Sequence, residues 1–225
     1  MAADKIFLIG MMGAGKTYWA QKMAKWNKCV GYDLDALIEM NEEKTIAEIF
    51  EEEGEEYFRK VEAKILRWFK EKKKFIIATG GGTPCFQENM SWMKKEGLVI
   101  WLDPSLEVLV NRLSLEKQQR PLIASLNDNE IAAFIENKLV ERHSYYAQAH
   151  YRINTDSMNE ASMKKLIAKR KTGIAGIATL NGTRKIHPKI TDYGRKLATL
   201  HQSKAGRALN AWRWHKQVMN GIASV

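Results

Sequence analysis

Residues 10–17 read Gly-Met-Met-Gly-Ala-Gly-Lys-Thr, and this stretch decides the fold of the 225-residue chain. It fits the pattern G-x-x-x-x-G-K-[ST] of a phosphate-binding loop. An apolar run at residues 5–9 predicts a buried strand before the loop, and the residues after Thr17 predict a helix. A chance match in a glycine turn is the alternative. A strand, a glycine turn and a helix start in this order favour a nucleoside triphosphate site.

The loop offers both backbone and side-chain contacts to a nucleotide. Several N–H groups would converge at its tip, where the helix dipole adds partial positive charge. Lys16 would reach the β- and γ-phosphates, and the hydroxyl of Thr17 would bind Mg²⁺. The predicted nucleotide contacts in this loop are Met12, Gly13, Ala14, Gly15, Lys16 and Thr17.

The order of the predicted elements indicates an α/β fold. Strand patterns alternate with helical patterns over about the first 160 residues, which is typical of a parallel sheet. We expect a three-layer sandwich of the phosphate-loop (P-loop) type around a central five-stranded parallel sheet. The predicted strands are Lys5–Ile9, Cys29–Tyr32, Phe75–Thr79, Leu98–Leu102 and Tyr151–Asn154.

Two segments interrupt this alternation. Residues 35–72 carry consecutive helical patterns with no strand between them, which predicts a helical insertion over the sheet edge. Residues 114–128 are polar and hold Arg120, which predicts a mobile lid that keeps water out of the closed site. The helix before this lid is predicted to have Asp103 as its N-cap and Pro104 at its first position.

Two carboxylates, Asp33 and Asp35, directly follow the second predicted strand. Alternation along an extended chain would point both off the same end of the sheet, where the phosphate loop also lies. One could hold Mg²⁺, directly or through water, while the other faces a substrate hydroxyl. The alternative is that Asp35 caps the helix that begins with Ala36, although capping and catalysis can coexist.

Glycines 80–82 follow the third predicted strand, where they would let a ligand approach backbone N–H groups closely; a flexible turn is the alternative. No acidic residue ends this strand, so Asp33 is the available replacement for the carboxylate that usually supports the metal there. Three arginines, Arg59, Arg120 and Arg142, could each clamp carboxylate or phosphate oxygens, or could be solvated surface residues.

Composition restricts the partners of the chain. The net charge of +10 comes from residues 164–225, which hold 14 Lys and Arg and one acid, whereas residues 1–163 hold 22 Lys and Arg and 25 acids. The phosphate-loop body at residues 1–163 therefore gives no support to nucleic-acid binding. No run approaches the roughly 18 apolar residues of a membrane span, and no signal peptide is recognised, so we expect a cytoplasmic protein without a membrane partner. Cys29 and Cys85 are expected to be free thiols.

Taken together, these segments resemble the shikimate kinase family. The family pattern comprises the phosphate loop, D-x-D after the second strand, G-E-x-x-F-R in the substrate-binding helices, G-G-G after the third strand, R-P-L in the lid and R-x-x-x-Y near the last long helix. All six motifs occur in this order over about residues 4–170. The matches are residues 10–17, Asp33 and Asp35, Gly54-Glu55 with Phe58-Arg59, Gly80–Gly82, Arg120-Pro121-Leu122, and Arg142 with Tyr146.

The resemblance implies an ATP-dependent kinase that transfers the γ-phosphoryl group to the 3-hydroxyl of shikimate, in aromatic amino acid biosynthesis. It implies that Arg59 and Arg142 hold the shikimate carboxylate, and that Asp35 orients the attacking hydroxyl and can deprotonate it. The implied substrate contacts are Asp35, Arg59, Gly80, Gly81, Gly82 and Arg142; the catalytic residues are Lys16, Asp35 and Arg120; Arg112 and Arg120 join the ATP contacts; and Thr17 and Asp33 support Mg²⁺.

Two positions depart from the family. Ile153-Asn154-Thr155 stands where V-D-T is common, which leaves the later adenine contacts open, and Tyr18 replaces a small residue. The resemblance covers a kinase domain at residues 1–172, expected to be monomeric. It leaves a basic extension at residues 173–225 that we expect to be disordered, weakly helical or not native to the enzyme.

Two alternative functions are compatible with the phosphate loop. One is another small-metabolite kinase, such as a gluconate kinase, which would not require both Arg59 and Arg142 around a carboxylate. The other is a nucleotide-binding module whose basic extension, with Trp212 and Trp214, binds nucleic acid; this reading is less favoured.

Overall fold

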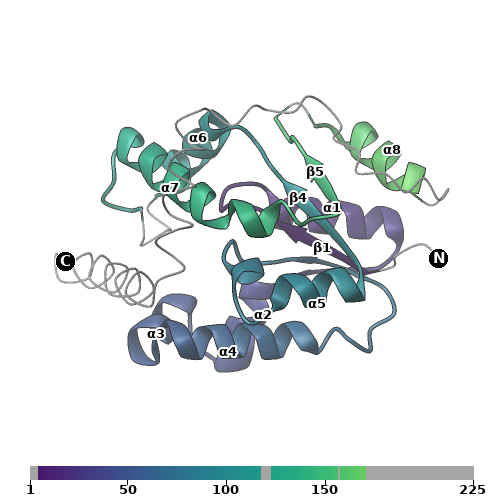
Figure 1. The fold of residues 1–225 in the computed structure, drawn as a ribbon, viewed down its shortest axis with the longest axis horizontal. Coiled ribbons are helices and arrows are strands. Elements are labelled where there is room, and N and C mark those ends of the chain that lie inside the picture. Colours follow the sequence, from purple (N-terminus) through teal and green to yellow (C-terminus); the bar gives the residue numbers. More distant parts are fainter. Residues whose placement is uncertain (1–4, 118–122, 157, 171–225) are drawn as a thin grey trace.

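Five parallel strands form the centre of the molecule in a computed structural model that describes residues 5–117, 123–156 and 158–170 (Figure 1). The sheet has the order β2-β3-β1-β4-β5. Every pair is parallel, with Phe7 of the central strand between Ile77 and Val99. The predicted five-stranded parallel sheet is therefore confirmed. The strands are β1 (Lys5–Ile9), β2 (Val30–Asp33), β3 (Phe75–Ala78), β4 (Leu98–Leu102) and β5 (Tyr151–Ile153).

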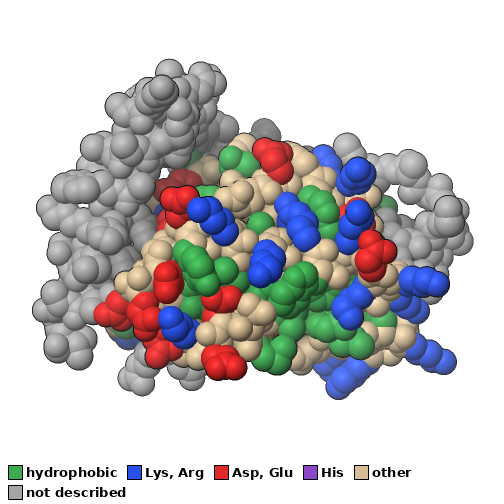
Figure 2. All heavy atoms as spheres, turned by 90° about the horizontal axis from the view of Figure 1, so that it is seen from below, with side chains coloured by type: hydrophobic (Ala, Val, Ile, Leu, Met, Phe, Trp, Pro, Cys, Tyr) green, Lys and Arg blue, Asp and Glu red, His purple; other side chains and the backbone are tan. Residues whose placement is uncertain are grey.

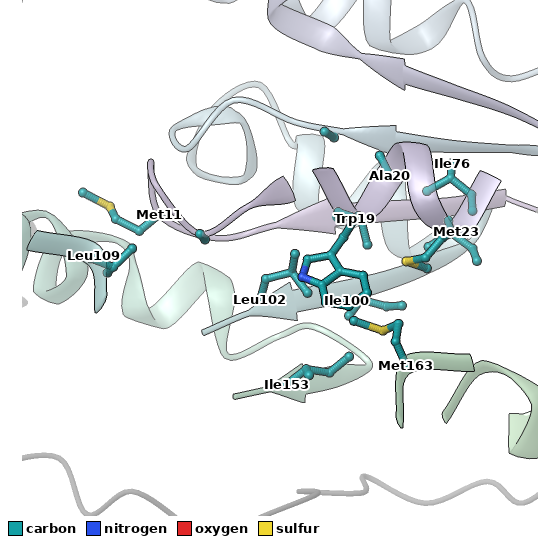
Figure 3. Packing of buried hydrophobic residues seen from close by; sticks show 14 of the residues in the cluster. Met11, Trp19, Ala20, Met23, Ile76, Ile100, Leu102, Leu109, Ile153 and Met163 are labelled. Carbon is teal, nitrogen blue, oxygen red and sulfur yellow. The ribbon is translucent and has the colours of Figure 1, made fainter. Parts of the chain in front are cut away.

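Both faces of the sheet are buried, and successive strand residues alternate between two hydrophobic clusters. In β1, Ile6 and Leu8 join one cluster, and Phe7 and Ile9 join the other. Figure 3 shows Trp19 of helix α1 (Lys16–Asn27) within the first cluster. Each fully buried large apolar side chain contributes about 1.5–3 kcal/mol, and burial on both faces explains why the central strands are continuous apolar runs.

Helices cover the two faces of the sheet in separate layers (Figure 1). The end of α7, at Tyr146, also reaches the second cluster. Among the described residues, no helix has both the length and the apolar composition needed to cross a membrane. The first cluster receives α1, α6 (Leu106–Glu116), α7 (Asp128–Tyr146) and α8 (Glu160–Arg170), and the second receives α2 (Leu34–Glu42), α3 (Ile46–Glu52), α4 (Gly54–Arg67) and α5 (Asn89–Glu96).

The helical insertion predicted at about residues 35–72 consists of α2, α3 and α4, without a strand between them. Side-chain caps set two of the helix starts, with Asp33 at α2 and a capping box of Thr45 and Glu48 at α3. Helix α4 has two acids in its first turn and two bases in its last, which complements its dipole. Figure 2 shows the molecule from below, the side on which α3 and α4 lie in Figure 1. Acidic side chains gather at the left end of this face, near α3, and basic side chains at the right end.

The start of α6 differs from the prediction. Its N-cap is Ser105, whose hydroxyl accepts from the backbone N–H of Val108 (3.3 Å), so the assignment of Asp103 was wrong. Asp103 instead forms an ion pair with Arg152 of β5 (2.6 Å). The prediction overlooked that a serine cap could follow the proline as readily as an aspartate could precede it.

Within the predicted lid at residues 114–128, the structure describes residues 114–117 and 123–128. Helix α6 continues to Glu116 and α7 begins at Asp128, so both ends of the segment belong to helices. Arg120 and the extension at residues 173–225 lie outside the described residues. The two cysteines are free, as expected.

Candidate active site

The C-terminal ends of the strands meet at one edge of the sheet, where a cleft of about 930 Å³ opens. The phosphate loop follows β1, Asp33 ends β2, and glycines 80–82 follow β3. Ligands of parallel α/β sheets bind at this edge. Of the predicted site residues, those that line the cleft are Met12, Gly13, Gly15, Lys16, Thr17, Asp33, Asp35, Gly81 and Arg112.

The phosphate loop makes the turn from β1 into α1. Gly13 and Gly15 have φ angles of 77° and 81°, in the left-handed region that favours glycine. Helix α1 begins without a side-chain cap and without an acid in its first turn, so its positive dipole end is left to an anionic ligand. The Lys16 ammonium donates to the carbonyl oxygens of Gly10 (3.0 Å) and Met11 (2.9 Å), which keeps the lysine side chain along the loop.

Thr17 and Asp33 connect the start of α1 to the end of β2. The Thr17 hydroxyl donates to Asp33 Oδ2 (2.5 Å), and Asp33 Oδ1 accepts from the backbone N–H groups of Asp35 (3.0 Å) and Ala36 (3.4 Å). Asp33, rather than Asp35, is therefore the cap of α2.

These two side chains also fit a magnesium ion. Hydroxyl and carboxylate oxygens suit this hard cation, which commonly takes one or two protein ligands and completes its shell with phosphate and water. The described residues contain no group of three or more His, Cys, Asp or Glu side chains that could hold a metal without such help. Thr17 and Asp33 are therefore suited to a cation that arrives with a nucleotide.

Asp35 lies in the first turn of α2, and its side chain reaches the cleft. Strand alternation was the wrong reason for pairing it with Asp33, because the helix start brings it there. Asp35 is exposed to solvent at the cleft, but the protein atoms around the cleft partly desolvate its carboxylate. This desolvation, followed by the negative charges of Asp33 and Glu62, raises its pKa to about 6, against opposing effects of Lys16 and Arg59. Asp35 is therefore a stronger base than an ordinary carboxylate and is still ionised at neutral pH.

Glycines 80–82 each leave room for a different side chain. An added Cβ atom at any of the three would come closer to that side chain than Cβ atoms normally approach. A merely flexible turn does not explain this packing. The observed packing requires that side chains approach the backbone closely, which only glycine allows. The distances from such an atom are 2.9 Å from Gly80 to the carboxylate of Asp35, 2.8 Å from Gly81 to the guanidinium of Arg142, and 2.7 Å from Gly82 to the guanidinium of Arg59.

Arg59 on α4 is held by two carboxylates. Its Nε and Nη2 donate to Glu55 Oε1 (3.2 and 3.1 Å), and its Nη1 donates to Glu62 Oε2 (2.9 Å). Glu62 is fully buried, and its other oxygen accepts from the hydroxyl of Thr83 (2.5 Å). Removing one partner of a buried ion pair costs about 3–5 kcal/mol, so the Arg59 guanidinium is firmly placed.

Arg142 extends from α7 to glycines 80–82. Its Nη1 lies 3.6 Å from Sδ of Met11, and no described carboxylate forms an ion pair with it, in contrast to Arg59. One turn later, the Tyr146 hydroxyl donates to the carbonyl oxygen of Gly81 (2.6 Å). Burial raises the pKa of Tyr146 to about 12, so this hydroxyl remains a donor at neutral pH. Arg142 is thus the less neutralised of the two arginines.

Arg112 of α6 lines the cleft beside the phosphate loop. Its Nη1 donates to the carbonyl oxygen of Gly13 (2.9 Å), and its contact with ATP stays a prediction. Tyr18, where the chain departs from the family pattern, lines the same cleft, and so does Thr155, the last residue of the divergent segment Ile153-Asn154-Thr155 and the one that matches the family. Ala14 belongs to the phosphate loop, but its side chain is fully buried, so only its backbone is suited to a nucleotide contact.

Sequence reasoning missed the residues that hold Arg59 in place. Glu62 and Thr83 fix Arg59, and Phe86 contacts its guanidinium. Glu62 could have been found from its position three residues after Arg59 on one helix, a spacing that favours pairing. Thr83 and Phe86 carried no comparable signal, because their role depends on how the turn after glycines 80–82 folds.

Comparisons with known proteins agree with this geometry. A family model described as "Shikimate kinase" matches residues 12–171. The chain is 41% identical over 156 residues to a shikimate kinase of Phocaeicola vulgatus, which covers 69% of this chain and 89% of the relative. A crystal structure of the shikimate kinase of Bacteroides thetaiotaomicron superposes with a TM-score of 0.68 and 36% identity, covering 75% of this chain and 96% of that one. The shikimate kinase of Acinetobacter baumannii in complex with shikimate gives a TM-score of 0.63 and 32% identity, over 75% and 90% of the two chains.

The raised pKa of Asp35 predicts a stability gain for Asp35→Asn in the ligand-free protein. Because the folded-state pKa of about 6 lies above the ordinary value of 3.8, the ionised carboxylate destabilises the fold above about pH 6, and this penalty is lost as the pH falls from about 6 towards 3.8. Solvent at the cleft screens part of the penalty, so the variant should melt at a slightly higher temperature than the wild type at pH 8, by a margin that narrows from pH 6 to pH 5. Thermal unfolding of both proteins across this range tests the prediction.

The control for this measurement is Glu136→Gln, which removes one negative charge from the exposed surface of α7. An Asp35→Asn margin that stays constant from pH 8 to pH 5, or that is absent at pH 8, would contradict the assigned environment of Asp35.

Proposed function

The chain belongs to the shikimate kinase family, and from this premise we propose that it transfers the γ-phosphoryl group of ATP to the 3-hydroxyl of shikimate. The activity is that of an ATP-dependent kinase, as in the relatives that it matches. We further propose that the enzyme depends on Mg²⁺ and works in the cytoplasm as a monomer.

One observation carries the proposal. The turn at glycines 80–82 brings a carboxylate and two guanidinium groups to the edge of the sheet that also holds the phosphate loop. An acceptor with both a carboxylate and a hydroxyl matches this set, because guanidinium groups bind carboxylates in two places and Asp35 can accept a hydroxyl proton. A neutral sugar would have no need of two arginines.

In the proposed mechanism the carboxylate of shikimate binds to Arg142 and Arg59. Its 3-hydroxyl then lies against Asp35, which orients it and accepts its proton as the oxygen attacks the γ-phosphorus. The bond from this phosphorus to the bridging oxygen of ADP breaks, and the charge leaves with ADP. Positioning and charge stabilisation supply most of the rate in reactions of this kind.

The phosphate loop would stabilise the charge that moves in this step. Lys16 would exchange its two carbonyl acceptors for phosphate oxygens, and the N-terminus of α1 would hold the β-phosphate. A bound Mg²⁺ would neutralise charge on the phosphates, and Thr17 and Asp33 are the residues suited to hold it. Arg120, outside the described residues, is proposed to cover the γ-phosphate, and Arg112 to contact the nucleotide beside Gly13.

Substrate selection tests the proposed function. We expect ADP release with shikimate and much slower release with quinate or gluconate, when each is supplied with ATP and Mg²⁺ in a coupled assay. Residues 1–172 alone should show the same shikimate turnover, because every residue proposed to act lies within them. Turnover on gluconate without turnover on shikimate would overturn the proposal. Salt-sensitive nucleic-acid binding that survives Lys16→Ala and is lost on deleting residues 175–225 would instead favour a binding module.

Asp35 predicts an acid limb in the pH profile of catalysis. At saturating ATP, kcat/KM for shikimate should fall as the pH drops below about 6, because protonation removes the group that accepts the hydroxyl proton. Asp35→Asn should lose about 10²- to 10⁴-fold in kcat, the usual contribution of a general base. Its residual activity should lack this limb. If wild type and Asp35→Asn both lost activity below about pH 6, this pH dependence would belong to the nucleotide or to another side chain.

The unequal pairing of the two arginines predicts unequal effects on binding. Arg142→Gln should raise KM for shikimate by about 10- to 100-fold, since hydrogen bonds to charged groups contribute roughly 1.5–3 kcal/mol, and should leave KM for ATP nearly unchanged. Arg59→Gln should raise KM less but should lower the melting temperature more, because Glu62 loses its buried partner. Steady-state kinetics and thermal unfolding separate the two effects. Equal KM values for wild type and Arg142→Gln would contradict this assignment.

A further inference from the structure

An aromatic side chain covers the guanidinium of Arg59 at the edge of the substrate site. The guanidinium carbon lies 4.2 Å from the ring centre of Phe86 and 4.9 Å from that of Phe58. Phe58 is a core residue, with 4% of its surface exposed, whereas Phe86 keeps 38% of its surface exposed. The closer of the two contacts is thus made by Phe86, the ring that is not part of the hydrophobic core.

The turn that presents Phe86 is tied to the Arg59 network at three points. Gly82 leaves the space that the Arg59 guanidinium fills, and the hydroxyl of Thr83 holds Glu62, the carboxylate that binds Arg59 Nη1. Phe86 ends the short turn Thr83–Cys85, and its carbonyl oxygen accepts from the N–H of Asn89 at the start of α5 (2.9 Å). Residues 82–86 therefore give Arg59 its space, its polar anchor and its aromatic cover.

Exposure distinguishes a structural role for Phe86 from a role in the site. A large apolar ring exposed by more than a third adds little to the core, so packing alone does not require it at this position. A cation beside an aromatic face gains attraction that grows when water is excluded, and the Arg59 side chain is only 12% exposed. Arginine also loses considerable rotamer freedom when it binds a ligand, and a stacked guanidinium has lost much of it beforehand.

We propose that Phe86 is a positioning residue for substrate binding, which holds the plane of the Arg59 guanidinium ready for the carboxylate of the acceptor. The inference rests on the proposed function, because it takes the acceptor carboxylate as the ligand of Arg59. Glu55 and Glu62 fix the edge of the guanidinium through hydrogen bonds, and Phe86 fixes its face. These contacts together leave Arg59 one orientation in which a carboxylate can approach.

The test compares Phe86→Leu with Phe86→Tyr in the full chain. Loss of the ring should raise KM for shikimate by about 3- to 10-fold, the range expected for one partly desolvated cation–aromatic contact. KM for ATP, kcat and the melting temperature should stay near their wild-type values. Phe86→Tyr keeps the aromatic face and should restore the wild-type KM for shikimate. Combining Phe86→Leu with Arg59→Gln should add little to the effect of Arg59→Gln alone, because the ring acts through the arginine.

A matched control is Trp68→Leu, which removes an aromatic ring with 49% exposure at the other end of the Arg59 helix and should leave both KM values unchanged. An unchanged KM for shikimate in Phe86→Leu would overturn the inference, and so would equal rises in the KM values for shikimate and ATP. Absence of shikimate turnover in the wild-type chain would instead overturn the proposed function.

Discussion

The absence of side chains at residues 80–82 is the constraint on which the site depends. One carboxylate and two guanidinium groups approach this short turn to distances that Cβ atoms do not normally allow. The turn can lie there because β3 is next to the central strand β1, so its C-terminal end lies beside the phosphate loop. The parallel sheet sets where the two loops meet, and the glycines set how closely the functional side chains approach.

The insertion of α2, α3 and α4 places its functional residues by capping and by buried pairing. Asp33 ends β2 and caps α2, which fixes the direction in which Asp35 leaves the helix start. Glu62 is buried on α4 and joins Arg59 to Thr83 of the glycine turn, so the insertion is tied to the sheet edge by an ion pair inside the protein. Such a pair adds little net stability, but it strongly disfavours other arrangements of the two partners.

Much of this architecture could be predicted from the sequence, and the exceptions share a physical cause. The alternation of strands and helices, the helical insertion, and the meeting of Asp33 and glycines 80–82 at one edge follow from local patterns and from the common edge of parallel strands. Asp35 was placed at this edge for the wrong reason, because the start of α2 and not strand alternation brings it there. The cap of α6 was misplaced because serine and aspartate cap helices about equally well. Phe86 was missed because its contact with Arg59 joins residues 27 positions apart across a turn whose shape no local pattern specifies.

In the proposed mechanism, the charges around Asp35 link substrate binding to catalysis. Desolvation and the nearby carboxylates Asp33 and Glu62 raise its pKa, whereas Lys16 and Arg59 oppose the rise. An anionic acceptor would neutralise Arg59, and the phosphates would neutralise Lys16. The two positive charges that lower the pKa of Asp35 would then act on it less, and its pKa would rise further. The carboxylate then becomes a better base as the reactants assemble, provided that it stays ionised at the working pH. The residues proposed to bind the reactants would therefore also set the pKa of the group proposed to accept the proton.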